Sequence, residues 1–387
     1  MNEVYLDNNA TTVCDPAVVE EMSPFFTEKG YNPSSIHRLG QAVGREVAKR
    51  REQVAGLLGA SSPDEIVFTA GGSEADNLAV IGAAYNYRDR GRHVITTPVE
   101  HPAVLEPCDW LAEEGWDVTY LPVDETATVN AGDLEAAIRD DTVLVSVMHA
   151  NNEVGTVEPI TELGRICRER GVLFHTDAVQ SIGKLPVNVG QLNADMLAIA
   201  AHKFYGPKGV GALYVRSGVE LEPIIHGGHQ EGGRRAGTTD AAGIVGLAKA
   251  LEMAVNGQER EADHLGKLRK RLVKAVNEDM PEAIIVGHPE NVLPGTVNVC
   301  FPGLDGEAIL LALDAEGFAV STGSACSSGS PEPSHVHLAM GIKPEVARGS
   351  IRISMGRYNT EEEIERLVRI LPAIVRRLLE VSPLAGK

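Results

Sequence analysis

The sequence predicts an α/β protein with a large domain built on a mainly parallel sheet and a smaller α+β domain in the C-terminal part. Between residues 60 and 216, short apolar runs alternate with helix-like stretches, as in the strand–helix units that build parallel sheets. Most of these runs are nearly continuous in apolar residues, which is typical of strands buried on both faces. After about residue 256 the pattern changes to a charged helix and short strands.

Apolar runs between turn-forming residues define the expected strands of the large domain. We expect strands over Glu65–Thr69, His93–Thr97, Asp117–Leu121, Val143–Met148, Val172–His175, Met196–Ala200 and Gly209–Val215. In open α/β sheets, ligands bind outside the carboxyl ends of the strands. Functional side chains are therefore expected directly after these strands.

The C-terminal part carries its own elements. We expect helices over Ala241–Val255, Glu261–Glu278 and Thr360–Leu379, and short strands near Ala283–Val286 and Thr296–Phe301. Thr360 is a suitable N-cap for the last helix, which has one apolar face. The predicted large domain spans residues 14–257, and the small domain combines residues 1–13 with 258–387.

Length and charge limit the classes of function. A chain of 387 residues is too long for a single small hydrophobic core and suits a large domain with a smaller one. A net charge of −19 disfavours tight contacts with nucleic acid phosphates. No apolar stretch approaches the roughly 18 residues of a membrane span, and the first residues lack signal-peptide features, so a cytoplasmic protein is expected. The five cysteines are scattered, which argues against a disulfide framework and a metal site.

A lysine that follows an apolar strand gives the first chemical signal. Lys203 lies in Ala201-His202-Lys203-Phe204-Tyr205-Gly206-Pro207 and opens into a turn. Desolvation and nearby cations can lower a lysine pKa enough for imine formation with an aldehyde. Alone, a lysine at this position is more often a solvated loop residue.

Asp177 follows the strand before it, and Gln180 lies three residues further on. A carboxylate at this position can keep a pyridine nitrogen protonated, which makes the ring an electron sink. Gln180 can reach the phenolic oxygen of such a ring. The alternative for Asp177 is an N-cap.

Three more segments place polar residues after strands. Gly72 and Ser73 open a helix whose free N–H groups suit a phosphate, although a capped tight turn has the same sequence. His101 could stack on a flat ring and move protons, or simply begin a helix. Asn152 follows another buried strand. Because these polar groups close consecutive strands, we expect them to meet at one site.

The small domain supplies two candidates. Cys326 lies in Ser321-Thr322-Gly323-Ser324-Ala325-Cys326-Ser327-Ser328-Gly329, a stretch of small residues that suits a nucleophilic thiol better than a packing cysteine. Arg352 lies in an alternating strand and could hold a substrate carboxylate through two hydrogen bonds, or be a surface residue.

With these residues in place, the chain resembles the cysteine desulfurases of the NifS/IscS type over essentially its whole length. The matching segments include Tyr5-Leu6-Asp7-Asn8-Asn9-Ala10-Thr11-Thr12, Asn32-Pro33-Ser34-Ser35-Ile36-His37, and the Lys203 and Cys326 motifs. The resemblance implies the fold-type I architecture of pyridoxal 5′-phosphate (PLP) enzymes, a homodimer, and transfer of sulfur from L-cysteine to Cys326.

The resemblance also implies a role for each residue. Lys203 is similar to the Schiff-base lysine, Asp177 to the partner of the ring nitrogen and Gln180 to that of the ring oxygen; His101 resembles the stacked histidine, Gly72, Ser73 and His202 the phosphate ligands, Thr238 the threonine that reaches the phosphate from the other subunit, Asn152 and Arg352 the carboxylate anchors, and Cys326 the persulfide cysteine. Family members often carry serine where this chain has Ala200, which predicts somewhat weaker PLP binding.

Three alternatives remain at this point. A PLP transaminase would share the cofactor residues without needing Cys326, and a selenocysteine lyase would share nearly all of them. A sulfur carrier or redox sensor without catalysis would need Cys326 but not Lys203. The sulfur acceptor, an iron–sulfur scaffold or another carrier, and a role dedicated to nitrogenase are not specified by the sequence.

Overall fold

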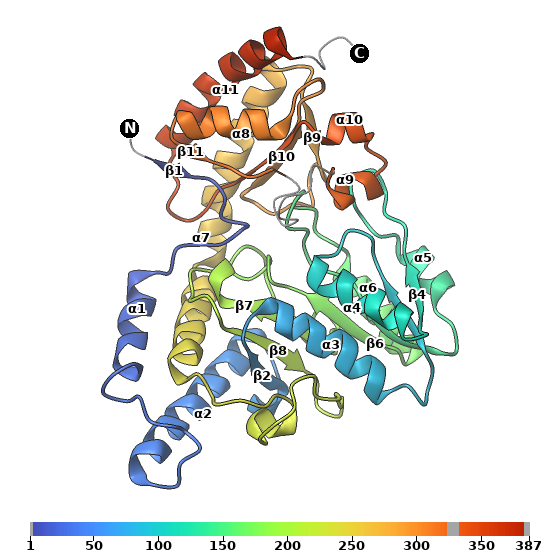
Figure 1. Ribbon diagram of the computed structural model, residues 1–387, viewed down its shortest axis with the longest axis vertical. Coiled ribbons are helices and arrows are strands. Elements are labelled where there is room, and N and C mark those ends of the chain that lie inside the picture. Colours follow the sequence, from blue (N-terminus) through green and yellow to red (C-terminus); the bar gives the residue numbers. More distant parts are fainter. Residues whose placement is uncertain (1–2, 323–332, 383–387) are drawn as a thin grey trace.

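The computed structural model describes residues 3–322 and 333–382. Figure 1 shows a larger lower part and a smaller upper part, and the long helix α7 (Ala241–Asp279) runs from one into the other. This arrangement agrees with the α/β class and the two-part organisation expected from the sequence.

A seven-stranded mixed sheet forms the centre of the larger part, counted over the described residues. Its order is β2-β8-β7-β6-β5-β3-β4, with β8 antiparallel to both β2 and β7 and the other neighbours parallel. The strands are β2 (Ile66–Thr69), β3 (His93–Thr96), β4 (Asp117–Tyr120), β5 (Thr142–Ser146), β6 (Leu173–Asp177), β7 (Met196–Ala200) and β8 (Gly211–Val215). Each expected strand is confirmed, and only the ends shift by a few residues.

Helices cover both faces of this sheet, which explains the nearly continuous apolar runs of its strands. One face packs against α3 (Gly72–Asn86) and α4 (Pro102–Glu113). The other packs against α1 (Pro16–Met22), α2 (Arg38–Leu58), α6 (Ile160–Arg170) and the first half of α7. The short helix α5 (Ala131–Ala137) lies near α6.

The smaller part is an antiparallel sheet with helices on it. Its strand order is β12-β10-β9, and the N-terminal strand β1 pairs with β11. The elements are β1 (Val4–Tyr5), β9 (Ile284–Val286), β10 (Thr296–Cys300), α8 (Gly306–Ala315), β11 (Phe318–Ala319), α9 (His335–Ala339), α10 (Pro344–Ala347), β12 (Ser350–Ser354) and α11 (Glu361–Val381). As expected, Thr360 caps α11, through a capping box with Glu363.

Two helices expected over 241–255 and 261–278 are one continuous helix, α7, so the expectation of a break was wrong. Gly257 lies inside it, at a cost of about 1 kcal/mol relative to alanine. Residues up to Ala254 pack in the core of the larger part, and residues from Leu265 pack in the core of the smaller part. Burial on both sides therefore outweighs the weak helix propensity between them, and the division at 257/258 remains a prediction.

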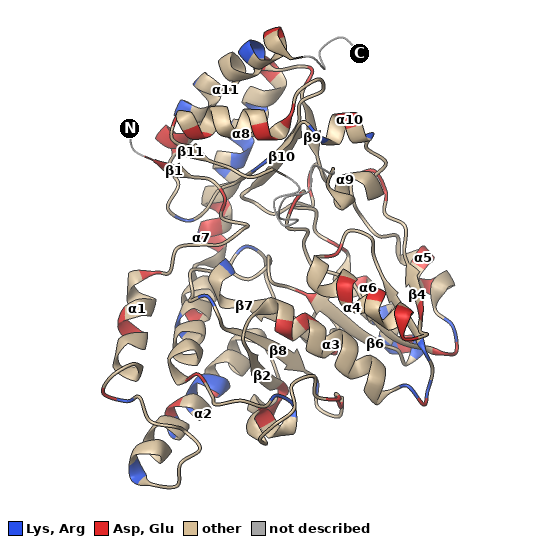
Figure 2. Ribbon diagram, in the orientation of Figure 1, with Lys and Arg blue, Asp and Glu red and all other residues tan. Residues whose placement is uncertain are grey.

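Charged residues are interspersed along the helices of both parts (Figure 2). Among the described residues, we find no helix with the length and apolar character that crossing a bilayer requires.

Candidate active site

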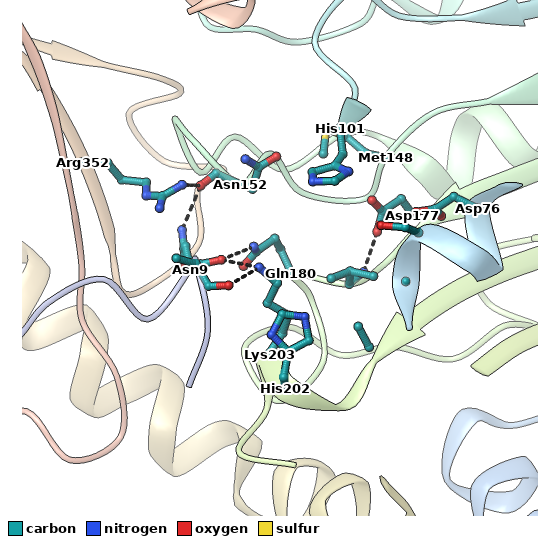
Figure 3. A pocket seen from close by; sticks show the side chains of 15 residues that line it. Asn9, Asp76, His101, Met148, Asn152, Asp177, Gln180, His202, Lys203 and Arg352 are labelled. Carbon is teal, nitrogen blue, oxygen red and sulfur yellow. Dashed lines mark hydrogen bonds between the residues drawn. The ribbon is translucent and has the colours of Figure 1, made fainter. Parts of the chain in front are cut away.

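A cavity of about 290 Å³ lies where the carboxyl ends of β6 and β7 meet the start of α3. Figure 3 shows Arg352 and Asn152 at one end, Asp177 and Asp76 at the other, and His101 across from Lys203. The lining contains Gly72, Ser73, His101, Asn152, Asp177, Gln180, His202, Lys203 and Arg352, all of them expected from the sequence, together with Asn9, Ala10, Asp76, Met148, Val179 and Ala200. The predicted convergence of strand-end residues is confirmed.

Lys203 ends a short 3₁₀ turn, η3 (Ala201–Lys203), that directly follows β7. Its Nζ donates to two backbone carbonyls of the N-terminal segment, Asn9 O at 2.6 Å and Ala10 O at 2.8 Å. The side chain is half-buried and lines the cavity. The alternative of a solvated loop lysine is therefore wrong.

Asp177, the last residue of β6, is buried, and its Oδ1 accepts a hydrogen bond from Val179 N at 2.8 Å. Burial raises its pKa to about 6, although the Lys203 ammonium opposes the shift. Asp76 is its neighbour, and burial together with the Asp177 charge raises the pKa of Asp76 well above the usual range. At neutral pH, Asp177 is thus mainly ionised, while Asp76 holds its proton more strongly than a free aspartate.

His101 is the N-cap of α4, as one expectation had it, and it also lines the cavity. Its stacking on a ring stays a prediction. Its Nδ1 accepts a hydrogen bond from Ala103 N at 3.0 Å. Burial lowers its pKa to about 4, with a smaller contribution from the Lys203 charge. The ring is therefore neutral near pH 7, and its hydrogen resides on Nε2.

The N-terminus of α3 suits an anion. Its N-cap is Gly71, and no side chain of the described residues caps it. A Cβ added to Gly72 would lie 2.9 Å from Val179 Cγ2, so the glycine keeps the backbone accessible to a ligand. Ser73 adds a hydroxyl at the same place. Free N–H groups, the helix dipole and this hydroxyl together favour a phosphate.

His202 and Ala200 complete this side of the cavity. His202 Nδ1 lies 3.1 Å from Thr11 Oγ1, and burial lowers the histidine pKa to about 4, with help from Lys203. His202 is thus neutral and can take part in a hydrogen bond through Nε2. The methyl of Ala200 faces the same space, where serine would add a hydroxyl.

Arg352 in β12 has 1% of its surface exposed, so the alternative of a surface residue is wrong. Its Nη1 donates to Asn152 O at 3.0 Å, and its Nη2 pairs with Asp7 Oδ1 at 2.7 Å. Its Nε has no hydrogen-bond partner among the described residues. Arg352 also lines the cavity, and its guanidinium keeps N–H donors that Asn152 and Asp7 do not take, which suits a ligand carboxylate.

Sequence reasoning missed the contribution of the N-terminal segment. Asn9 O accepts from both Lys203 Nζ and Gln180 Nε2, the latter at 2.9 Å, and Asn9 Nδ2 donates to Asn152 O at 3.2 Å. Asp7 pairs with Arg352. The sequence did carry a signal, because the segment from Tyr5 to Thr12 matches the desulfurase family, but that match assigned no role to Asp7 or Asn9.

These residues fit PLP. The uncapped α3 terminus can hold the phosphate, Asp177 the ring nitrogen, Gln180 the ring oxygen, and Lys203 the aldehyde carbon. A neutral imidazole at His101 can lie against the ring. Two observations support this fit: the polar groups just named line one cavity, and the absence of a side chain at Gly72 leaves the backbone of the α3 N-terminus accessible.

One expected site residue lies elsewhere, and another is not among the described residues. Thr238 lines a separate cavity beside Arg235 and Asp240, so within this chain it does not join the main cavity. Cys326 lies outside the described residues. Of the described cysteines, Cys108, Cys167 and Cys300 are buried and Cys14 is partly exposed, and burial raises the pKa of each thiol. No group of three or more metal-ligating side chains occurs in the described ranges.

The model of the aminotransferase class-V family matches residues 4–367, so the chain belongs to that family. Within it, the chain belongs to the NifS/IscS cysteine desulfurases. It is 49% identical to cysteine desulfurase IscS of Dictyoglomus turgidum over 98% of this chain and 96% of the relative, and 48% identical to cysteine desulfurase NifS of Azotobacter vinelandii over 99% and 95%. A solved NifS-like protein superposes with a TM-score of 0.91 at 43% identity, covering 97% of this chain and all of that one. The predicted fold and family are confirmed.

Proposed function

We propose that the protein is a PLP-dependent cysteine desulfurase that converts L-cysteine to L-alanine and carries the sulfur as a persulfide on Cys326. Membership of the NifS/IscS group supports the activity. The roles of individual residues are proposed from their geometry in this chain.

The observation that favours a desulfurase over a transaminase is the anchoring of both flanks of the Cys326 segment at the cavity. On one side, Ser321 exchanges two backbone hydrogen bonds with Arg352, at 2.7 and 3.1 Å. On the other, His335 Nε2 lies 3.0 Å from Glu100 O, next to His101. A transaminase has no need for a thiol between two such anchors.

In the proposed reaction, Arg352 binds the carboxylate of L-cysteine through its available donors, and the Asn152 amide assists. When bound, PLP supplies an electron sink for the bonds at the substrate α-carbon. Lys203 Nζ accepts the α-proton and later returns a proton to carbon. Ionised Asp177 keeps a proton on the nitrogen that faces it, while neutral His101 provides a hydrogen-bond donor at Nε2.

Sulfur transfer balances without an added oxidant. The thiolate of Cys326 attacks the substrate sulfur, the S–S bond forms, and the Cβ–S bond breaks with its electron pair left on Cβ. A proton then adds at Cβ to give the methyl group of alanine. The buried thiols of Cys108, Cys167 and Cys300 are poor candidates, because burial opposes formation of their thiolates.

We further propose that Thr238 acts across a homodimer, because it lies away from the cavity of its own chain. The persulfide is then delivered to an iron–sulfur scaffold or another acceptor protein in the cytoplasm.

The test is a visible spectrum of the purified protein with added PLP, followed by assays of alanine and sulfide after addition of L-cysteine. Wild type should show a near-visible band that responds to L-cysteine and should release both products. Cys326→Ala should keep the band and its response but release no sulfide. Sulfide release that does not depend on Cys326 would overturn the persulfide assignment.

A further inference from the structure

A second lysine lies beside the active-site cavity, outside the set of residues that bind the substrate or cofactor in the proposed function. Lys184 follows β6 by seven residues and is only 7% exposed. Its Nζ donates to Gln180 Oε1 at 3.0 Å and to Asn9 Oδ1 at 3.2 Å. No carboxylate in the described part of the chain forms an ion pair with it. Burying a cation with only amide oxygens as partners lowers the stability of the fold. Such a residue is therefore a candidate for a functional role.

The hydrogen-bond chemistry of Lys184 determines how both amides are oriented. In its protonated form, which prevails below about pH 7, the Lys184 ammonium donates and does not accept, so it selects the oxygen of each amide. The nitrogen of Gln180 must then point the other way, where Nε2 donates to Asn9 O at 2.9 Å at the edge of the cavity. Asn9 Nδ2 is likewise directed to Thr296 Oγ1, at 2.9 Å, and to Asn152 O.

We propose that Lys184 is a positioning residue, which fixes the Gln180 amide with its N–H groups toward the ring oxygen of PLP and keeps positive charge beside Lys203. The proposal rests on the PLP-dependent function proposed above. Lys184 itself does not line the cavity, so it acts through Gln180 and Asn9.

The charged groups around Lys184 support this role. Burial is the main cause that lowers its pKa, to about 7, followed by the charge of Lys203; Glu261 opposes the shift and Arg352 adds to it. Glu261 is engaged by Arg357, whose Nε lies 2.9 Å from Glu261 Oε2. Below about pH 7, where Lys184 is protonated, its charge is not neutralised by a direct ion pair within the described residues, and it disfavours a proton on the nitrogen of Lys203.

Removing Lys184 should raise the pKa of the Lys203 nitrogen in the loaded enzyme for two reasons. Loss of its charge raises the pKa of the Lys203 nitrogen. Release of the Gln180 amide removes a donor from the ring oxygen, which also makes the protonated form more favourable. Both effects move the pH titration of the visible band of the bound cofactor to higher pH.

The experiment compares Lys184→Met, Lys184→Arg and a core control, Leu272→Ala, each loaded with PLP. Leu272 is fully buried in the core of the smaller part and does not line the cavity, so its truncation lowers stability alone. We measure the midpoint of the pH titration of the visible band and the dissociation constant of PLP. If Lys184→Met proves insoluble, Lys184→Gln replaces it.

We expect Lys184→Met to raise the midpoint by about one pH unit and to weaken PLP binding. Lys184→Arg should restore the midpoint, and Leu272→Ala should leave it unchanged while lowering the unfolding temperature. An unchanged midpoint in Lys184→Met, with wild type showing the band, overturns the positioning role alone. A wild type that shows no band after loading overturns the PLP-dependent function and this role with it.

Discussion

Arg352→Ala tests the proposed recognition of the substrate carboxylate. The guanidinium is 1% exposed and already bonded to Asp7 and Asn152, so its remaining donors are fixed in direction. Each hydrogen bond to a charged group contributes about 1.5–3 kcal/mol. We take the lower value for each bond, because Asp7 already shares the charge of Arg352. Two such bonds to a carboxylate then contribute about 3 kcal/mol. This corresponds to about a 150-fold loss of kcat/KM.

The assay measures sulfide release from L-cysteine and from cysteamine, which lacks the carboxylate. Wild type should prefer L-cysteine, and Arg352→Ala should lose about two orders of magnitude on L-cysteine but little on cysteamine. Arg348→Ala removes an exposed arginine from the same part of the chain and is the matched control. Thermal unfolding of each variant separates loss of recognition from loss of folding.

Two results would refute this account. A decrease of less than tenfold on L-cysteine would mean that Arg352 is chiefly structural, held by its bond to Asp7. An equal decrease on both substrates would mean that the arginine supports the site without contacting the carboxylate.

Two further predictions follow from the buried ionisable groups. His101→Asn keeps a side-chain acceptor at the N-cap of α4, and His101→Ala removes it. Both variants should lower kcat at least tenfold, because both lose the imidazole. In urea denaturation, His101→Ala alone should lose about 1 kcal/mol of the free energy of unfolding through the missing cap. Burial raises the pKa of Glu158 to about 8, so the folded state binds more protons than the unfolded state between about pH 4.5 and 8. Stability should therefore fall as pH rises through this window, by at most about 5 kcal/mol, and Glu158→Gln should remove that dependence; parallel curves for both proteins would contradict it.

The strands and the meeting of their polar ends were predictable because both follow from local patterns. A nearly continuous apolar run marks a buried strand, and parallel strands bring their carboxyl ends to the same edge. Lys203, Asp177 and His101 could thus be placed in one site before any contact was known.

The parts of the site that sequence patterns did not give depend on contacts between distant segments. Asp7 meets Arg352 across 345 residues of chain, and Asn9 meets Lys203 across 194. Lys184, in a Gly-Lys-Leu-Pro turn, has the local sequence of a solvated loop lysine. Only the docking of the N-terminal segment against the sheet makes it a buried donor.

The distribution of charge along the cavity gives the site a direction. Ionised Asp177 lies at one end and Arg352 at the other (Figure 3), where Arg352 donates to Asn152 O and pairs with Asp7. A ligand with a protonated nitrogen near Asp177 and a carboxylate near Arg352 complements both ends. Ionised Asp177 would keep that nitrogen protonated, and the positive charge on the nitrogen would draw electrons from the carboxylate-bearing carbon when a bond at that carbon breaks.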